Sequence, residues 1–281
     1  MLAKRLLTAF IMLFIFLLSL LLDNKIYFVS LFTFCVSMVF LEWVQFFLEK
    51  KYKNYLYIFS LIIFVFLIYL SEFLFQDLSI KDNNIFKFLI SVVVILWISF
   101  AAMSVISHRD FSSLEKKFWL FFSIPACFSA WFAFVIFYKM HGNWFVISLL
   151  MPVWILDTSG YIFGKYMGRT KLIPKVSPGK TLEGAIAGIF FSVLFYIISS
   201  FFKGSFASFI LETHGVFVSL VLFFILSMVA ILGDLFESLL KRNFGIKDSG
   251  SLLPGHGGFF DRLDSLIPFI PMAIILSGVI N

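Results

Sequence analysis

Two carboxylates, a hydroxyl group and an amine share one face of a predicted helix at the end of a long apolar run. Asp234, Glu237, Ser238 and Lys241 stand at positions i, i+3, i+4 and i+7 of segment 233–242. Side chains at this spacing project from the same side of an α-helix. Glu237 and Lys241 are also typical of an ordinary helix end. Asp234 favours a functional role, because a carboxylate at membrane depth is costly and usually serves a function.

A glycine-rich segment, 247–264, contains His256 between glycines and the closely spaced Asp261 and Asp264. Glycine permits backbone conformations in which successive N–H groups point at one anion, which suits the oxygens of a phosphate. Aspartates are common at helix starts. Their position beside a glycine turn nevertheless favours a functional site. The other histidines are distant in the sequence, so we expect no zinc site.

A third polar segment, Ser-Pro-Gly-Lys-Thr-Leu-Glu-Gly at 177–184, follows Asp157 and a basic stretch and leads into a predicted helix. Its Gly-Lys-Thr sequence suggests a nucleotide-binding P-loop, but that motif needs a glycine where this chain has Pro174. A P-loop NTPase is therefore excluded. We expect basic side chains and the helix N-terminus to bind an anion. The structural alternative is an ordinary basic cytoplasmic loop.

Together the three segments supply carboxylates, basic side chains and glycine turns. Carboxylates alone would repel a phosphate, and basic residues alone would not require aspartates at membrane depth. A divalent cation reconciles the two, since Mg²⁺ typically takes one or two carboxylates together with substrate phosphates. The sequence therefore predicts metal-assisted phosphoryl or nucleotidyl transfer.

The composition shows which elements must position these residues. The 281 residues are 61% hydrophobic and 14% charged, with a mean hydropathy of +1.03. This excludes a soluble enzyme, a disordered chain and a single-anchor protein, and it predicts an all-α polytopic membrane protein. Cys35 and Cys127 lie in apolar runs and are interpreted as packing residues. Nine runs are predicted to span the membrane, at 6–22, 26–48, 56–75, 85–106, 118–138, 144–163, 182–202, 216–240 and 263–280.

Most of the 22 Lys and Arg residues fall on one side of these predicted spans. The positive-inside rule then predicts a cytoplasmic N-terminus, with segments 165–181 and 241–262 at the cytoplasmic face. The net charge of +6 is thereby explained without nucleic acid. Polar motifs concentrate in the second half, so we divide the chain into N-terminal membrane helices, 1–140, and a C-terminal catalytic membrane region, 141–281.

The segment 238–264 resembles a known family. Its pattern is Ser-x-x-Lys-Arg, four residues, then Lys-Asp-x-Gly-x-x-Leu-Pro-x-His-Gly-Gly-Phe-x-Asp-Arg-Leu-Asp. This closely resembles the signature of the phosphatidate cytidylyltransferases, also called CDP-diacylglycerol synthases. The segment 177–184 looks like a second element of that family, and 157–169 is similar to its Asp-Thr/Ser-rich helix end. Gly179 departs from the pattern, because the family often has Lys or Arg there.

The resemblance implies transfer of the cytidylyl group of CTP to phosphatidic acid, which gives CDP-diacylglycerol and pyrophosphate. The implied cofactor is Mg²⁺, and a second metal ion or a monovalent ion beside it is a further expectation. The implied metal ligands are Asp234 and Asp261, helped by Asp264 and Asp157. Lys241 and Arg262 join Asp234 and Asp261 as implied catalytic residues. The implied substrate-binding residues are Ser177, Lys180, Glu183, Ser238, Arg242, Lys247, Asp248, His256, Gly257 and Gly258.

The resemblance also implies a multi-pass protein of a bacterial-type inner membrane, with a homodimer as a further expectation. One alternative is a CTP-dependent enzyme acting on another lipid phosphate, such as a prenyl or ether lipid. The motif residues are expected to contact phosphates and not the apolar chains of the lipid, so the motif does not distinguish these acceptors. A second alternative is a transporter with a glycine-broken helix. That alternative predicts interruptions in both halves, whereas those of this chain lie in the C-terminal half.

Overall fold

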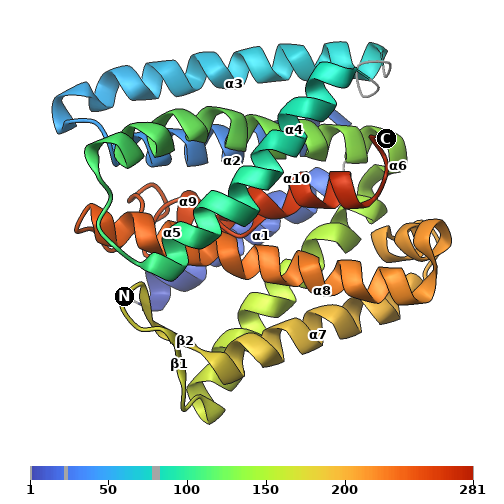
Figure 1. Ribbon diagram of the computed structural model, residues 1–281. Coiled ribbons are helices and arrows are strands. Elements are labelled where there is room, and N and C mark those ends of the chain that lie inside the picture. The colour runs from blue at the N-terminus through green and yellow to red at the C-terminus, as the bar shows by residue number, and fades with distance from the viewer. Residues whose placement is uncertain (1, 22–24, 78–82, 281) are drawn as a thin grey trace.

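The computed structural model describes residues 2–21, 25–77 and 83–280, which are predominantly helical (Figure 1). Six of the described helices are long and apolar enough to cross a membrane, which confirms the predicted all-α, multi-pass membrane class. The longer helices are α1 (Leu2–Leu21), α2 (Lys25–Gln45), α3 (Lys53–Gln76), α4 (Asn84–Leu96), α6 (Ser113–Met167), α7 (Leu182–Ser200), α8 (Phe206–Asn243) and α10 (Leu266–Leu276). The short ones are η1 (Lys50–Tyr52), the π-helix η3 (Trp97–Ala101), α5 (Ala102–Ser107) and α9 (Phe260–Leu263).

Glycines break the two longest helices. Gly142 in α6 has φ 79° and ψ −169°, and Gly215 in α8 has φ 76° and ψ 170°. Neither pair of angles is helical, and glycine adopts such positive φ values without steric cost. In Figure 1 the first part of α6 runs beside α2, and the part after the break turns away toward the hairpin. The predicted spans 118–138 and 144–163 fall on the two sides of Gly142.

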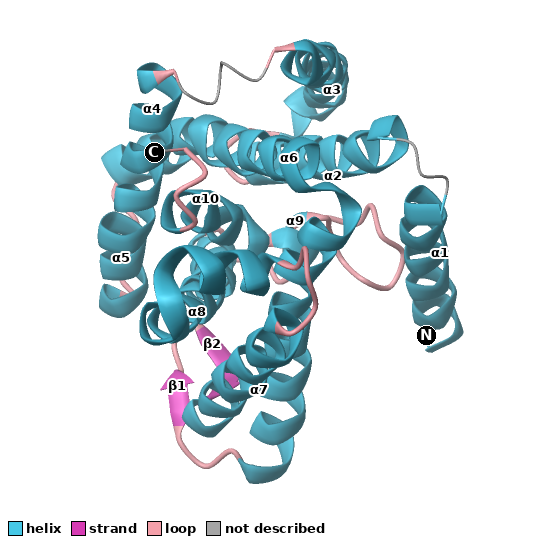
Figure 2. Ribbon diagram, turned by 90° about the vertical axis from the view of Figure 1, so that its right-hand side faces the viewer, coloured by secondary structure: helices cyan, strands magenta, loops and turns pink. Residues whose placement is uncertain are grey.

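The basic segment before α7 folds as a short antiparallel hairpin of β1 (Lys171–Ile173) and β2 (Ser177–Thr181). Thr181 ends the hairpin and caps α7, since its side-chain oxygen accepts a hydrogen bond from the Gly184 N–H at 3.2 Å. The hairpin lies beside the N-terminal end of α7 (Figure 2). The predicted start of a span at residue 182 is therefore confirmed as a helix start. The predicted end of the first span, Leu22, lies outside the described residues.

Aromatic side chains join the N-terminal helices to the C-terminal region. The ring of Trp43 in α2 stacks on that of Phe260 in α9, with centroids 4.9 Å apart, and lies 5.7 Å from the ring of Phe236 in α8. All three side chains are buried. Burial of such large rings contributes strongly to packing. Helix α2 is therefore fixed against the segment that carries the predicted chemistry.

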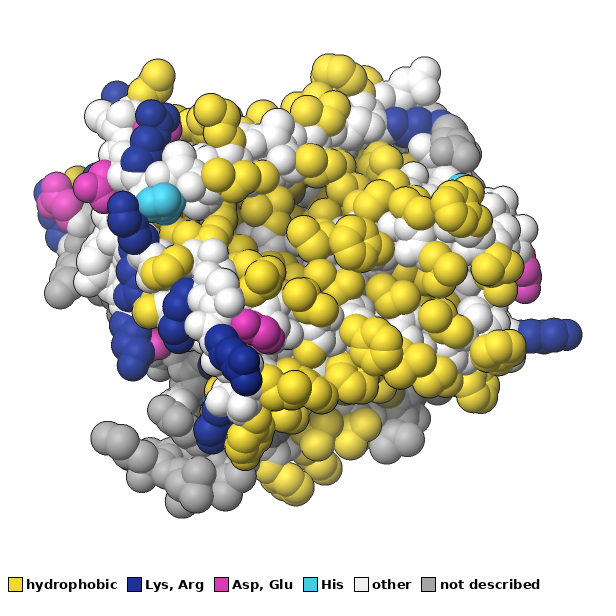
Figure 3. Space-filling view, turned by 60° about the horizontal axis from the view of Figure 1, so that its bottom comes forward, with side chains coloured by type: hydrophobic (Ala, Val, Ile, Leu, Met, Phe, Trp, Pro, Cys, Tyr) yellow, Lys and Arg dark blue, Asp and Glu magenta, His cyan; other side chains and the backbone are white. Residues whose placement is uncertain are grey.

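The outer surface is apolar over a broad area. Figure 3 shows hydrophobic side chains across most of one face, with Lys and Arg gathered mainly along its left edge. Helix α3 alone exposes Ile58, Leu61, Phe66 and Tyr69. An apolar surface of this extent suits contact with lipid chains.

Glycines allow α6 and α7 to approach closely. A Cβ atom placed on Gly184 would lie 2.6 Å from the carbonyl oxygen of Gly160 and 3.0 Å from the Cα of Gly164. Gly188, one turn further along α7, faces the Leu156 backbone in the same way. Small residues at this spacing let membrane helices pack with their backbones in contact. This packing places Asp157 of α6 near the start of α7.

The variant Gly184→Ala is expected to lower the free energy of unfolding by about 1–3 kcal/mol, because its methyl group would force these helices apart. The measurement is thermal unfolding in detergent micelles. Gly179→Ala is the control, since a Cβ atom there would meet no atom within 4 Å. Equal unfolding midpoints for the two variants would show that the close packing of α6 and α7 does not depend on the absence of a side chain at residue 184.

Candidate functional site

A cavity of about 1390 Å³ lies between α1, α2, α6, α7, α8 and the β1–β2 hairpin. Its wall has two chemically distinct parts. The polar part includes Asp157, Ser177, Lys180, Asp234, Lys241, Asp248, Asp261, Arg262 and Asp264. The apolar part includes Ile11, Leu13 and Phe16 from α1, Leu31 and Phe34 from α2, and Trp154, Ile231 and Leu263. The cavity therefore suits a ligand that carries both a charged group and an apolar group.

Three predicted metal ligands line the polar part from different elements. Asp157 comes from α6, Asp234 from α8, and Asp264 directly follows α9. Gly233 lets α8 approach α10, since a Cβ atom on it would lie 2.7 Å from the Cγ of Pro268. The same Cβ atom would overlap the carbonyl oxygen of Asp264, so the residue before Asp234 packs directly against Asp264. The structure thus brings these carboxylates together.

These side chains are of the type that binds Mg²⁺. Asp157, Asp234 and Asp264 all line the cavity, and Lys180 forms an ion pair with Asp234. Within residues 2–21, 25–77 and 83–280, no three His, Cys, Asp or Glu side chains form a group that would by itself hold a metal ion. Mg²⁺ often takes only one or two carboxylates and completes its shell with phosphates and water. The residues present therefore fit a cation that arrives with a phosphorylated substrate.

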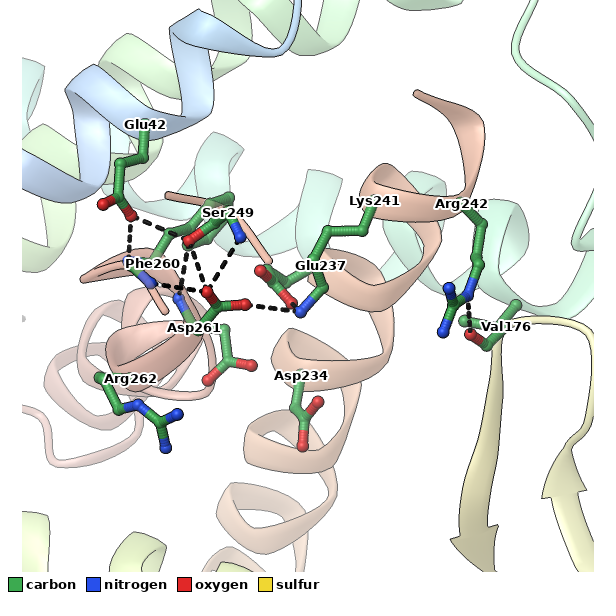
Figure 4. A network of polar contacts seen from close by, with 12 residues as sticks. Glu42, Val176, Asp234, Glu237, Lys241, Arg242, Ser249, Phe260, Asp261 and Arg262 are labelled. Carbon is green, nitrogen blue, oxygen red and sulfur yellow. Dashed lines mark hydrogen bonds and ion pairs between the residues drawn. The ribbon is translucent and has the colours of Figure 1, made fainter. Parts of the chain in front are cut away.

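Lys241 bridges two carboxylates at the end of α8. Its Nζ lies 2.5 Å from Oε2 of Glu237, one helical turn earlier, and 2.7 Å from Oδ1 of Asp261 (Figure 4). The Glu237 side chain is buried, at 1% exposed. A buried carboxylate is costly unless it is paired. The ammonium group of Lys241 therefore compensates Glu237 and at the same time fixes Asp261.

The second oxygen of Asp261 is bound by the glycine-rich segment. Its Oδ2 accepts hydrogen bonds from the N–H of Ser249 at 2.9 Å and the N–H of Gly258 at 2.8 Å, and it lies 2.9 Å from the Ser249 hydroxyl oxygen. Burial raises the pKa of Asp261, but the hydrogen bonds from Lys241 and Gly258 outweigh it and hold the pKa below its ordinary value. The backbone donors predicted to bind a phosphate thus bind a carboxylate of the protein itself. The metal-binding role of Asp261 stays a prediction.

Several other predicted substrate-binding residues have partners within the protein. Arg242 donates from Nε to the carbonyl oxygen of Val176 at 3.2 Å, which ties α8 to the hairpin. Glu183 accepts hydrogen bonds from the Thr170 N–H at 3.0 and 3.2 Å. The carbonyl oxygen of His256 accepts two hydrogen bonds from Arg262, at 2.7 and 3.1 Å. The predicted residues that do not line the cavity are Glu183, Ser238, Arg242, Lys247, His256, Gly257 and Gly258. Their substrate-binding roles stay predictions.

Glu42 was not among the predicted site residues, yet its carboxylate reaches this network. Its Oε2 accepts hydrogen bonds from the Phe260 N–H at 2.8 Å and from the Ser249 hydroxyl at 2.9 Å. The side chain is completely buried. One signal in the sequence could have identified it, because Glu42 is a single carboxylate within an apolar run.

Comparison with known proteins places these features in a family context. The sequence model of the cytidylyltransferase family matches residues 3–280. The chain is 37% identical over 183 residues to a phosphatidate cytidylyltransferase of Staphylococcus epidermidis, a match that covers 63% of this chain and 66% of that protein. Proteins of the same name from Staphylococcus aureus and Staphylococcus haemolyticus are also 37% identical, over 182 and 175 residues. These matches cover 66% and 63% of the two relatives and 63% and 62% of this chain. The chain thus spans just under two thirds of the length of these relatives.

Proposed function

The chain belongs to the cytidylyltransferase family, and on that basis we propose that it transfers the cytidylyl group of CTP to phosphatidic acid. The products are CDP-diacylglycerol and pyrophosphate. The observation that carries this proposal is the cavity with a charged part and an apolar part in one wall. Phosphatidic acid has the same division, a phosphate on two acyl chains, and the relatives named phosphatidate cytidylyltransferases support this substrate.

The reaction joins a phosphate oxygen of the lipid to the α-phosphorus of CTP, while the bond from that phosphorus to the pyrophosphate oxygen breaks. The lipid phosphate is already anionic at neutral pH, so the attacking oxygen does not need a general base. The required contributions are alignment and compensation of negative charge. Lys180 and Arg262 line the polar part of the cavity and supply positive charge there.

Mg²⁺ is the proposed cofactor, with Asp234 and Asp261, helped by Asp264 and Asp157, as the carboxylates that would hold it together with the substrate phosphates. When bound, such an ion neutralises charge that develops on the phosphate oxygens. Lys180 contacts Asp234 in this structure. That ammonium group would then turn from Asp234 to a phosphate as the substrates bind.

The proposed topology has nine membrane crossings and a cytoplasmic N-terminus, with the site at the cytoplasmic face of a bacterial-type inner membrane. In this proposal α6 makes two crossings, one on each side of Gly142, and the helical run 84–107 through α4, η3 and α5 makes one. The gathering of Lys and Arg along one edge supports this orientation (Figure 3). A homodimer stays a prediction.

The test is incorporation of label from α-labelled CTP into lipid by the purified protein in detergent micelles. We expect a labelled lipid with phosphatidic acid and Mg²⁺, and none when either is left out. A prenyl phosphate in place of phosphatidic acid is the matched acceptor control. Binding of CTP without a labelled lipid from phosphatidic acid would contradict the proposal, and turnover of the prenyl phosphate alone would favour a different lipid acceptor.

A further inference from the structure

A carboxylate from the N-terminal helices lies at the centre of the glycine-rich segment. Glu42 of α2 is completely buried and accepts hydrogen bonds from Ser249 and from the first residue of α9, Phe260 (Figure 4). These partners are 207 and 218 residues further along the chain. Among the residues that the structure describes, no Lys or Arg forms an ion pair with Glu42. A buried carboxylate without a cation is costly unless hydrogen bonds compensate it.

The glycines of the segment provide the space for this carboxylate. A Cβ atom on Gly250 would overlap Oε1 of Glu42, and one on Gly258 would overlap Oε2 of Glu42 and Oγ of Ser249. Both glycines therefore allow the backbone to lie directly against Glu42. The conformation of the segment is built around this side chain.

Ser249 connects Glu42 to Asp261. Its Oγ lies 2.9 Å from Oε2 of Glu42 and 2.9 Å from Oδ2 of Asp261, and it accepts a hydrogen bond from the Asp261 N–H at 3.2 Å. Asp261 in turn binds Lys241, and both of these line the cavity. Glu42 does not line the cavity. The hydrogen bonds of Glu42 therefore connect it to the cavity-lining residues through Ser249 and the start of α9.

We propose that Glu42 is a positioning residue for the transfer reaction, which holds Ser249 and the start of α9 so that Asp261 and Lys241 face the substrates. This inference rests on the proposed cytidylyl transfer. A displacement of about 1 Å at reacting groups lowers a rate by about 10². Loss of the Glu42 carboxylate should therefore appear in kcat, while KM for CTP changes little because no side chain is removed from the cavity wall.

The test compares kcat and KM of full-length variants in micelles, together with the folded fraction of each preparation. Glu42→Leu is expected to lower kcat about 10²-fold. Glu42→Gln is expected to stay within about threefold of the wild type, because Oε2 alone accepts both hydrogen bonds and an amide oxygen can take its place. Ser37→Ala is the matched control on α2, since its hydroxyl is buried and bonds only to the backbone of its own helix.

A double-variant cycle tests the route through Ser249. If Glu42 acts through Ser249, then adding Ser249→Ala to Glu42→Leu should lower kcat by less than about threefold further. A double variant whose loss equals the product of the two single losses would overturn the proposed route. Glu42→Asp is the second variant if Glu42→Leu does not fold. Its shorter side chain withdraws the oxygen from Ser249, so a kcat about tenfold lower is expected.

Other outcomes would also overturn the inference. One is wild-type kcat per folded molecule in Glu42→Leu or Glu42→Asp, which would make the carboxylate a folding element only. Another is a loss in Glu42→Gln as large as in Glu42→Leu, which would mean that the hydrogen bonds are not what matters. A wild-type protein that binds CTP but does not turn over phosphatidic acid would instead contradict the proposed function.

Discussion

Replacing Lys241 with methionine is expected to destabilise the protein by about 3–5 kcal/mol, because it leaves a buried carboxylate without its cation. Lys241 lies between Glu237, whose side chain is 1% exposed, and Asp261, at 9%. Methionine keeps a similar apolar chain but removes the charge that both carboxylates need. The measurement is thermal unfolding in detergent micelles, followed by tryptophan fluorescence, together with transfer activity, which should fall with it.

Lys180→Met is the matched control for this prediction. The ion pair of Lys180 with Asp234 is partly exposed, at 28% and 26%, so its loss should cost less than about 1 kcal/mol. Adding Glu237→Gln to Lys241→Met should restore part of the stability, because the buried charge is then removed as well. Equal destabilisation by Lys241→Met and Lys180→Met would contradict the assignment of Lys241 as the compensating group.

Replacing Asp234 with asparagine is expected to lower kcat by about 10²–10³ while the protein stays folded, because an electrostatic contact in the site is removed without a change in volume. Asp234 lines the polar part of the cavity and forms an ion pair with Lys180. This ion pair is partly exposed, at 28% and 26%, so it contributes less than about 1 kcal/mol to stability. The loss of the Asp234 carboxylate should therefore not destabilise the fold. The measurement is kcat and the Mg²⁺ concentration at half-maximal rate.

Glu212→Gln is the control, since Glu212 is an exposed carboxylate near the other end of the same helix, α8. It should leave both quantities unchanged. Turnover of Asp234→Asn within about threefold of the wild type, with an unchanged Mg²⁺ requirement, would be inconsistent with a direct role for Asp234 in charge compensation. A higher Mg²⁺ requirement with a restored kcat would support metal binding by Asp234.

Local periodicity was sufficient to predict which polar side chains share one face of a helix. The spacing of Asp234, Glu237 and Lys241 predicted a shared face, and the structure shows Lys241 paired with Glu237 one turn earlier. The apolar runs likewise predicted helices of membrane length, because a helix without water must satisfy its backbone groups internally. These features depend on residues a few positions apart. The sequence therefore determined the membrane class, the helices and the set of polar segments.

Only the tertiary structure decided what these segments bind to. The glycine-rich segment was predicted to surround a phosphate, yet Gly258 and Ser249 donate to Asp261, and Phe260 donates to Glu42. Glu42 and Ser249 are 207 residues apart, and no local spacing relates them. Their contact depends on how α2 packs against α9 through Trp43 and Phe260. Hydrogen bonds between distant segments follow from helix packing, so the sequence alone predicted the donors and the structure identified their acceptors.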